Sequence, residues 1–332
     1  RDTSVTGVQT CALPIYDPKQ HVVLFNHTAT HTYEAQSGLI GAAGQSLPNH
    51  KTLYTAQTTE RALADGQNQL VLTLASAPVD GVQLVKTYTL TRGSYAVAVK
   101  QEVVNTSAQA VRPSLYVQIE RDGTPPAAAP GPAFVGGPQS YTGMAIYSTK
   151  GKYQKIDFKH LDENKAEFEK SDDNGWVAMV QHHFVSAWLY NTQQAREFFA
   201  RKVDTNLYTM GMLIPVGEVA AGQRKAVDTV LYVGPQEEDK LSVLAPGLEL
   251  VKDYGWTHIL AKPLYLLLNF LHGVIGNWGW AIIALVVLLK AAFYWLNASA
   301  YRSMGKMKAL NPDRKSTRLN SSHRCISYAV FC

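Results

Sequence analysis

An apolar run near the C-terminal end constrains the fold of this chain more than any other feature. Asn277–Asn297 reads NWGWAIIALVVLLKAAFYWLN and contains one charged residue, Lys290. About 20 mainly apolar residues are enough for a helix to cross a bilayer. The Trp and Tyr residues near both ends of the run are typical of membrane interfaces. We therefore expect a transmembrane helix over residues 277–297, with a helix buried in a protein core as the alternative.

Basic residues follow this run, at Arg302, Lys306 and Lys308. Cytoplasmic loops of membrane proteins are enriched in Lys and Arg. We therefore expect residues 298–312 to begin a cytoplasmic loop. The chain before the run is then expected outside the inner membrane, in the periplasm.

The segment before the run, residues 255–276, has the pattern of an amphipathic helix. Its polar residues Lys262, Asn269 and His272 recur at helical spacing, and Leu, Phe, Ile and Val occupy the opposite face. Such a helix suits the plane of the membrane interface. An ordinary core helix has the same pattern and is the alternative.

Lys290 is a candidate functional residue because it follows the apolar stretch AIIALVVLL. A lysine at membrane depth costs about 2.5–3.5 kcal/mol on insertion scales, so it normally faces a polar or hydrated cavity. The alternative is that its long side chain reaches the headgroups from near the cytoplasmic end of the helix. Position alone does not separate the two hypotheses.

The larger part of the chain, from Gln20 to about Gly234, has a strand pattern. In Val82–Val104, period-two alternation on both sides of Arg92-Gly93 predicts a β-hairpin with one buried face. Many short strands separated by turn residues predict an all-β sandwich. The other predicted strands are Gln69–Ser76, Ser114–Arg121, Lys152–Phe158, Trp176–Tyr190, Leu207–Val216 and Ala226–Val233.

Other segments carry weaker signals. Gly123–Pro138 is rich in Pro and Gly and predicts a loop within the domain. Pro235–Tyr254 predicts a helix, which Glu237-Glu238-Asp239 would begin. Asp172-Asp173 indicates a solvated turn. His182-His183 is a poor metal site, because adjacent residues of a strand point to opposite faces.

Both ends of the chain resemble the translation of a sequencing-library adapter. Val5–Ile15 and Asp313–His323 correspond to complementary strands of one adapter, and the codons for Thr3-Ser4 and Arg324-Cys325 are complementary as a sample barcode would be. We therefore exclude residues 1–15 and 313–332 from fold reasoning. The remainder is expected to be a fragment of a longer protein.

The exclusion changes the bulk properties. All three cysteines lie in the excluded ends, so a disulfide framework or a thiolate metal site is not expected. Five of the 31 basic and two of the 26 acidic residues also lie there, which leaves 26 basic and 24 acidic residues and a net charge of +2. That charge excludes a strong electrostatic footprint for nucleic acid. No phosphate loop, nucleophile elbow or zinc-binding helix motif occurs, so we expect no catalytic residue, metal or cofactor.

Several motifs, in order, resemble those of the bacterial YidC insertases. The resemblance extends over almost all of residues 16–312 and includes soluble as well as membrane segments. The motifs are Tyr33–Leu39, Gly175–Met179, Val230–Pro235, Asp253–Trp256, Asn277–Gly279 and Tyr301–Lys308.

This resemblance implies a mainly β fold: a periplasmic β-supersandwich over residues 16–254, an interfacial helix over 255–276 and a transmembrane helix over 277–297. It also implies a non-enzymatic role in inserting nascent membrane proteins, alone or with the Sec translocon and its accessory subunits, in contact with membrane lipid. Lys290 would occupy the place of the arginine in a hydrophilic groove, where it keeps the charge but loses the bidentate geometry.

Two other functions stay open. One is a membrane-tethered periplasmic protein that binds or processes carbohydrate, since supersandwich folds occur in such proteins and fold does not determine function. The other is a docking domain for translocon partners, which is compatible with membership of the insertase family.

Overall fold

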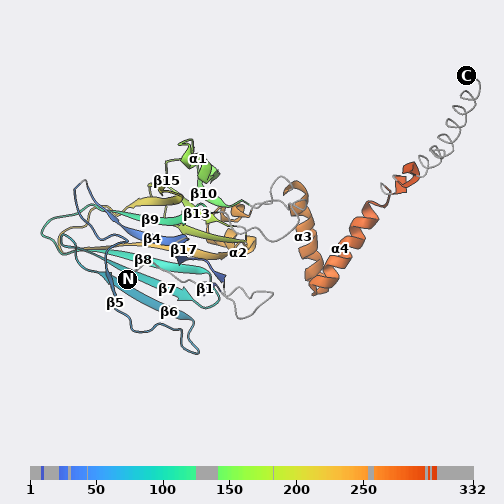
Figure 1. Ribbon diagram of the computed structural model, residues 1–332. Helices are drawn as coiled ribbons and strands as arrows, with labels where there is room; N and C mark the ends of the chain where they lie inside the picture. The colour runs from blue at the N-terminus through green and yellow to red at the C-terminus, as the bar shows by residue number, and fades with distance from the viewer. Residues whose placement is uncertain are drawn as a thin grey trace, which may run out of the picture. The chain divides into compact units, whose positions relative to one another are not determined.

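The computed structural model describes residues 9–10, 22–28, 31–42, 44–124, 141–181, 183–252, 258–295, 298–299 and 301–304. The chain forms two compact units, Arg1–Gly255 and Trp256–Cys332, which are described separately (Figure 1). The first is rich in β-strands and the second is helical.

Two large antiparallel sheets form the body of the first unit, beside a small two-stranded sheet, so the predicted β-sandwich is confirmed. The larger sheet has nine strands, and each pairs with a neighbour in antiparallel register. In spatial order its strands are β11 (Lys152–Ile156), β10 (Gly143–Ser148), β13 (Gly175–Val180), β14 (Phe184–Leu189), β17 (Arg224–Pro235), β8 (Ala96–Asn105), β7 (Val82–Thr91), β6 (Gln69–Ser76) and β5 (Tyr54–Ala56).

The smaller sheet has six strands, and a two-residue strand lies at each of its edges. Its order is β12 (Ser171–Asp172), β15 (Arg196–Asp204), β16 (Leu207–Pro215), β9 (Ser114–Asp122), β4 (Thr32–Ile40) and β3 (Asn26–His27). A short helix, α1 (Phe158–Asp162), follows β11 in the chain.

The hairpin predicted in Val82–Val104 is confirmed as β7 and β8. Residues alternate between buried and partly exposed along β7, and Val82, Leu84, Lys86 and Tyr88 are on the buried face. Lys86 therefore occupies a position that the alternation assigns to an apolar residue. Its side chain is 6% exposed.

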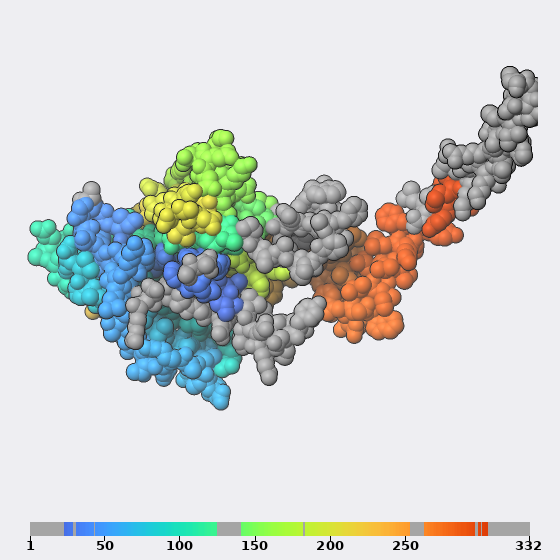
Figure 2. Space-filling view, in the orientation of Figure 1, coloured from blue at the N-terminus to red at the C-terminus, as the bar shows by residue number. Residues whose placement is uncertain are grey.

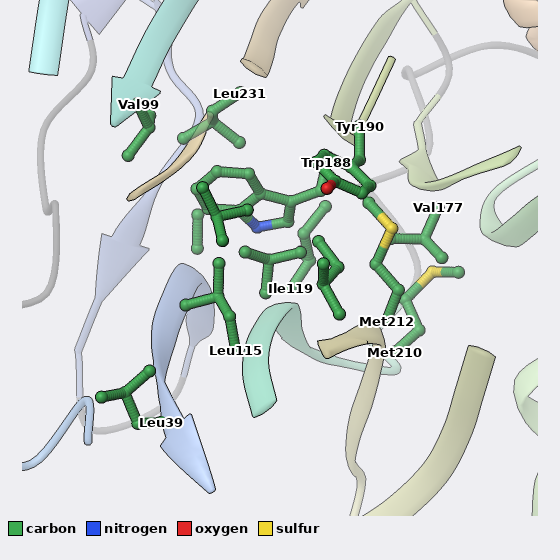
Figure 3. Packing of buried hydrophobic residues seen from close by; sticks show 14 of the residues in the cluster. Leu39, Val99, Leu115, Ile119, Val177, Trp188, Tyr190, Met210, Met212 and Leu231 are labelled. Atoms are coloured by element: carbon green, nitrogen blue, oxygen red, sulfur yellow. The ribbon is translucent and has the colours of Figure 1, made fainter. Parts of the chain in front are cut away.

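The main core fills the space between the sheets, and Trp188 of β14 lies within it (Figure 3). Leu115 and Ile119 of β9, with Met210 and Met212 of β16, come from the smaller sheet. The Trp188 indole N–H donates to the carbonyl of Gln118 at 3.0 Å, so this buried donor is satisfied and ties the sheets together.

A second apolar cluster covers the opposite face of the larger sheet, where α2 (Glu238–Leu244) and the 3₁₀ helix η1 (Leu248–Val251) pack. Trp176 of β13 donates to the carbonyl of Pro246 at 3.0 Å. The single helix predicted over Pro235–Tyr254 is wrong, because Pro246 and the left-handed Gly247 (φ 75°) separate two short helices. The acidic first turn of α2, Glu238 and Asp239, is confirmed.

Three further expectations need correction. Trp176–Tyr190 is a hairpin of β13 and β14 rather than one strand. His183 lies in the connection between these strands and His182 lies outside the described residues, so strand alternation does not apply to the pair. Asp172 is 6% exposed rather than solvated. Burial raises its pKa, but backbone N–H donors including that of Lys150 outweigh it and hold the pKa below its usual range.

The excluded N-terminal segment contributes one described feature. Gln9–Thr10 forms β1, which pairs with Val22–Val23 of β2. This pairing was not expected from a segment that we excluded from fold reasoning. Most of the predicted Gly123–Pro138 loop lies outside the described residues.

The second unit contains the helices α3 (His258–Ile275) and α4 (Trp278–Ala292), and the described residues 294–295, 298–299 and 301–304 are helical as well. The His272 and Trp278 rings stack across the turn, with centroids 3.8 Å apart. Gly276 in this turn has a φ of 73°, which favours glycine.

Within the range 277–297, where a transmembrane helix is expected, α4 covers Trp278–Ala292, and residues 296–297 lie outside the described residues. Among the helices that the structure describes, none combines the length and apolar character needed to cross a membrane.

Candidate functional site

The helical unit holds the candidate residue Lys290. Asn277 begins α4, because its side-chain oxygen accepts hydrogen bonds from the backbone N–H groups of Gly279 (2.8 Å) and Trp280 (3.3 Å). This cap satisfies donors that a helix N-terminus leaves free. Lys290 lies in the last turn, where a cation is favourable beside the helix C-terminus.

Both helices expose large apolar side chains. On α3, Leu266, Phe270 and Val274 are spaced four residues apart and are 57%, 67% and 72% exposed. On α4, exposed apolar side chains occur on every side of the helix, and Ala281 is its one fully buried residue. An exposed apolar surface of this extent indicates contact with a membrane or another protein.

Lys290 is itself exposed, and among the described residues it forms no ion pair. It is the one charged residue of α4. The helix therefore presents a single ammonium group at one end of an apolar surface. Such a group can attract an anionic or polar segment electrostatically, and no bond needs to be made or broken.

A second candidate site, which the sequence did not predict, is a cleft of about 1010 Å³ in the β-rich unit. It lies against β4, β9, β16 and β15 of the smaller sheet and extends to β7 of the larger one. Figure 2 shows one face of this unit, where atoms of the N-terminal strands (blue) and of the segment around β15 (yellow) lie close together.

Glutamate and glutamine side chains form two cross-strand pairs between β4 and β9 in this cleft. Gln36 lies opposite Gln118, and Glu34 lies opposite Glu120. The Gln118 amide donates to the Gln36 side chain at 2.7 Å, and Gln36 donates to Glu34 at 3.1 Å. His27 contacts Glu34 at 2.8 Å. Burial, followed by the charge of Glu34, raises the pKa of Glu120.

Basic side chains also line this cleft. His50 Nδ1 lies 2.6 Å from the hydroxyl of Tyr116, and Lys51 is its neighbour in the chain. Lys86 donates to the carbonyl of Ser37 at 2.8 Å. Burial lowers the pKa of Lys86 to about 7, and burial with the charges of Lys51 and Lys86 lowers that of His50.

One sequence signal marks a residue of this cleft as buried, although it does not reveal the cleft itself. Lys86 shares the alternation phase of Leu84 and Tyr88, which marks it as a charged residue on a buried face. The facing Gln and Glu residues give no such signal, because their pairing depends on the register of two strands far apart in the sequence.

Comparison with known proteins identifies both units. The family model described as YidC periplasmic domain matches residues 7–267, and the one described as 60Kd inner membrane protein matches residues 270–321. Both matches extend some residues into the terminal segments excluded above.

Curated relatives give the same result. The membrane protein insertase YidC of Burkholderia cenocepacia (strain HI2424) is 46% identical over 91% of this chain and 53% of its own length. That of Aromatoleum aromaticum is 46% identical over 89% of this chain and 52% of its own. The chain thus spans about half the length of these relatives.

Solved structures are much less similar. A galactose mutarotase related enzyme from Lactobacillus acidophilus shares 9% identity, with a TM-score of 0.36, over 60% of this chain and 82% of its own. This likeness is too weak to support the carbohydrate alternative. The family models and the curated relatives instead agree along the chain, which belongs to the YidC family.

Proposed function

We propose that this chain contributes the periplasmic domain and part of the membrane core of an insertase of the bacterial inner membrane. The observation that carries the proposal is the helical unit, whose exposed apolar surface ends at the single charge of Lys290. Such a surface needs an apolar environment. Membership of a family whose relatives are named membrane protein insertases supports the membrane as that environment.

In this function Lys290 acts through its charge. Within a hydrated groove completed by the rest of the protein, its ammonium group attracts the acidic or polar flank of a nascent membrane protein. This attraction lowers the cost of moving the flank into the apolar layer. Because the effect is electrostatic, the protein acts as an insertase and chaperone rather than as a catalyst of bond chemistry.

The β-rich unit, residues 16–254, lies in the periplasm in this proposal, and α3 contacts lipid at the membrane interface. The exposed Leu266, Phe270 and Val274 support that placement of α3. The full-length protein is multi-pass and works with nascent membrane proteins, either alone or with the Sec translocon and its accessory subunits. Co-purification of the translocon with the full-length protein tests that partnership.

The test of the insertase function uses a chimera. Residues 16–312 replace the matching part of the Burkholderia cenocepacia relative, and the chimera is expressed in a strain depleted of its own insertase. We expect growth and insertion of membrane proteins to be restored. A chimera that reaches the membrane at normal level but inserts nothing would contradict the proposal.

Variants of the chimera then test Lys290. Lys290→Arg keeps the charge and should retain activity. Lys290→Ala should reduce insertion of passengers with acidic flanks about tenfold, corresponding to ~1.4 kcal/mol, and affect apolar-flanked passengers less. Lys290→Glu should be worse because it repels acidic flanks.

The matched control is Arg302→Ala, which removes one positive charge beyond α4 and should have a smaller effect. If Lys290 only anchors the helix end, its Ala and Gln variants change protein level but not insertion per molecule. Insertion normalised to the amount of protein in the membrane separates the two hypotheses.

A further inference from the structure

Lys86 carries an amine that is enclosed between the two sheets. It lies on the face of β7 that points toward the smaller sheet, and its side chain is buried. The amine donates to the carbonyl of Ser37 at 2.8 Å and lies 4.4 Å from the centroid of the Tyr54 ring. Among the described residues no carboxylate pairs with it. A positive charge on Lys86 therefore has no counter-charge in its surroundings.

The surroundings of Lys86 favour the neutral amine. Burial lowers the pKa of Lys86 from 10.5 to about 7. The hydroxyls of Tyr54 and Tyr88 supply no negative charge, because burial raises the pKa of both. Near pH 7 about half of the Lys86 side chains are then neutral, against roughly one in three thousand for a lysine in water. A neutral amine is a nucleophile, and desolvation is one of the ways in which proteins activate lysine.

The cleft gives small molecules access to this amine. Lys86 lines it together with Leu39 and Leu231, which belong to the core between the sheets. The exposed Leu53 lines it as well, so the cleft leads from solvent into the core. Its volume of about 1010 Å³ is at the upper end of the range for small-molecule sites, roughly 300–1,000 Å³.

Gln101 lies next to Lys86 and has an unused amide. The two residues are cross-strand partners on β8 and β7, and Cβ atoms of such pairs lie about 5 Å apart. Gln101 is fully buried, and neither atom of its amide has a hydrogen-bond partner among the residues described. Buried amides of this kind are costly until a ligand satisfies them. A hydroxyl group suits this amide, because it can donate to the oxygen or accept from the nitrogen.

We propose that Lys86 forms a reversible imine with a small α-hydroxy aldehyde, and that the Gln101 amide binds the hydroxyl group of this aldehyde. The lone pair of the Lys86 nitrogen attacks the carbonyl carbon, and a proton passes from this nitrogen to the carbonyl oxygen. The resulting carbinolamine loses water: the nitrogen lone pair forms the C=N bond, and hydroxide leaves with the remaining N–H proton. The step needs no oxidant or reductant. Its neutral product avoids the cost of a buried charge.

This site is separate from Lys290 and does not depend on the insertase function. The test labels the full chain in non-ionic detergent at pH 7 with limiting glycolaldehyde or acetaldehyde, in the presence of sodium cyanoborohydride. The reducing agent converts each imine to a stable secondary amine, which peptide mass spectrometry assigns to its lysine. Lys100 is the internal control, because it is exposed on the opposite face of β8. The ratio of labelling at Lys86 to that at Lys100 is measured for each aldehyde.

We expect glycolaldehyde to label Lys86 at least about tenfold more than Lys100, and urea should abolish this difference because it exposes both amines to water. The ratio for glycolaldehyde should exceed that for acetaldehyde about fivefold, the effect of one hydrogen bond. Gln101→Leu should lower the glycolaldehyde ratio to that of acetaldehyde. The matched control Gln223→Leu removes an exposed amide outside the cleft and should change nothing.

The wild-type protein decides the proposal even if Gln101→Leu fails to fold. Labelling of Lys86 that is no stronger than that of Lys100 would overturn the proposal. Equal ratios for the two aldehydes would also overturn it, because Gln101 would then bind no hydroxyl group. In a Gln101→Leu protein with the circular dichroism spectrum of the wild type, an unchanged glycolaldehyde ratio would have the same meaning.

Discussion

Replacement of the buried Arg196 should destabilise the β-rich unit more than any loss of a surface charge. Arg196 begins β15 and is 1% exposed. Its guanidinium donates only to backbone carbonyls and lies 4.5 Å from the centroid of the Tyr190 ring. The accepting carbonyls belong to Asp173, Gly175, Tyr190, Thr192 and Gln194.

The magnitude follows from these contacts. Arg196→Met leaves several buried carbonyls without a donor, and each unsatisfied group costs about 1–3 kcal/mol before relaxation. Water can reach some of them after the change, so we expect a loss of about 3–5 kcal/mol, in the range found when one partner of a buried charge is removed. For a domain of this size, that lowers the Tm by roughly 6–20 °C. The stability of Arg196→Lys should fall between those of the wild type and Arg196→Met, because an ammonium group has three donors.

Urea unfolding of the full chain in detergent, followed by near-UV circular dichroism, measures the effect through the packing of Trp176 and Trp188. The control is Arg224→Met, because Arg224 is 69% exposed and lies 3.9 Å from Glu102. It should cost less than about 1 kcal/mol. An Arg196→Met protein within 1 kcal/mol of the wild type, with an unchanged m-value, would refute the reasoning.

Three further predictions concern other parts of the chain. Burial lowers the pKa of Lys86 from 10.5 to about 7, so between these pH values the unfolded chain binds a proton that the folded chain does not. The free energy of unfolding should therefore rise from pH 7 to 10 in the wild type, but not in Lys86→Met. Gly211→Ala should cost about 1–3 kcal/mol in urea unfolding, because its Cβ would lie 2.4 Å from the carbonyl oxygen of Val117; an unchanged midpoint would contradict this. Deletion of residues 1–15 and 313–332 should leave the Tm of the β-rich unit unchanged, although it removes β1, and a clear drop would contradict their exclusion.

The fold class could be predicted from the sequence because the strands alternate so regularly. Gln69–Ser76 was predicted with the bounds that β6 has, and the β7–β8 hairpin was confirmed. The prediction of one strand over Trp176–Tyr190 was wrong, because the residues between β13 and β14, Gln181–His183, include no Gly, Asn or Pro to signal a turn. The helix prediction was also wrong over Pro235–Tyr254, because Pro246 and the left-handed Gly247 divide the expected helix in two.

The candidate sites differ in how far sequence could reach them. Lys290 stands out because one charge in an apolar run is visible without a structure, and its role stays a prediction. The cleft could not be predicted, because it depends on the contact between Lys86 and Ser37, which are 49 residues apart in the chain. Alternation marks Lys86 as buried, but only the packing of β4 near β7 shows what it contacts.

The short strand β3 also has a consequence for association. It pairs with Thr32 and Tyr33, and among the described strands none lies beside the rest of β4 on that side. Open strand edges invite further strands, and natural proteins block them. Here Lys86 donates to the carbonyl of Ser37, and the N–H of Leu39 donates to the carbonyl of Pro48 at 2.8 Å. These two contacts occupy backbone groups of the open edge, and they therefore hinder strand addition between folded molecules.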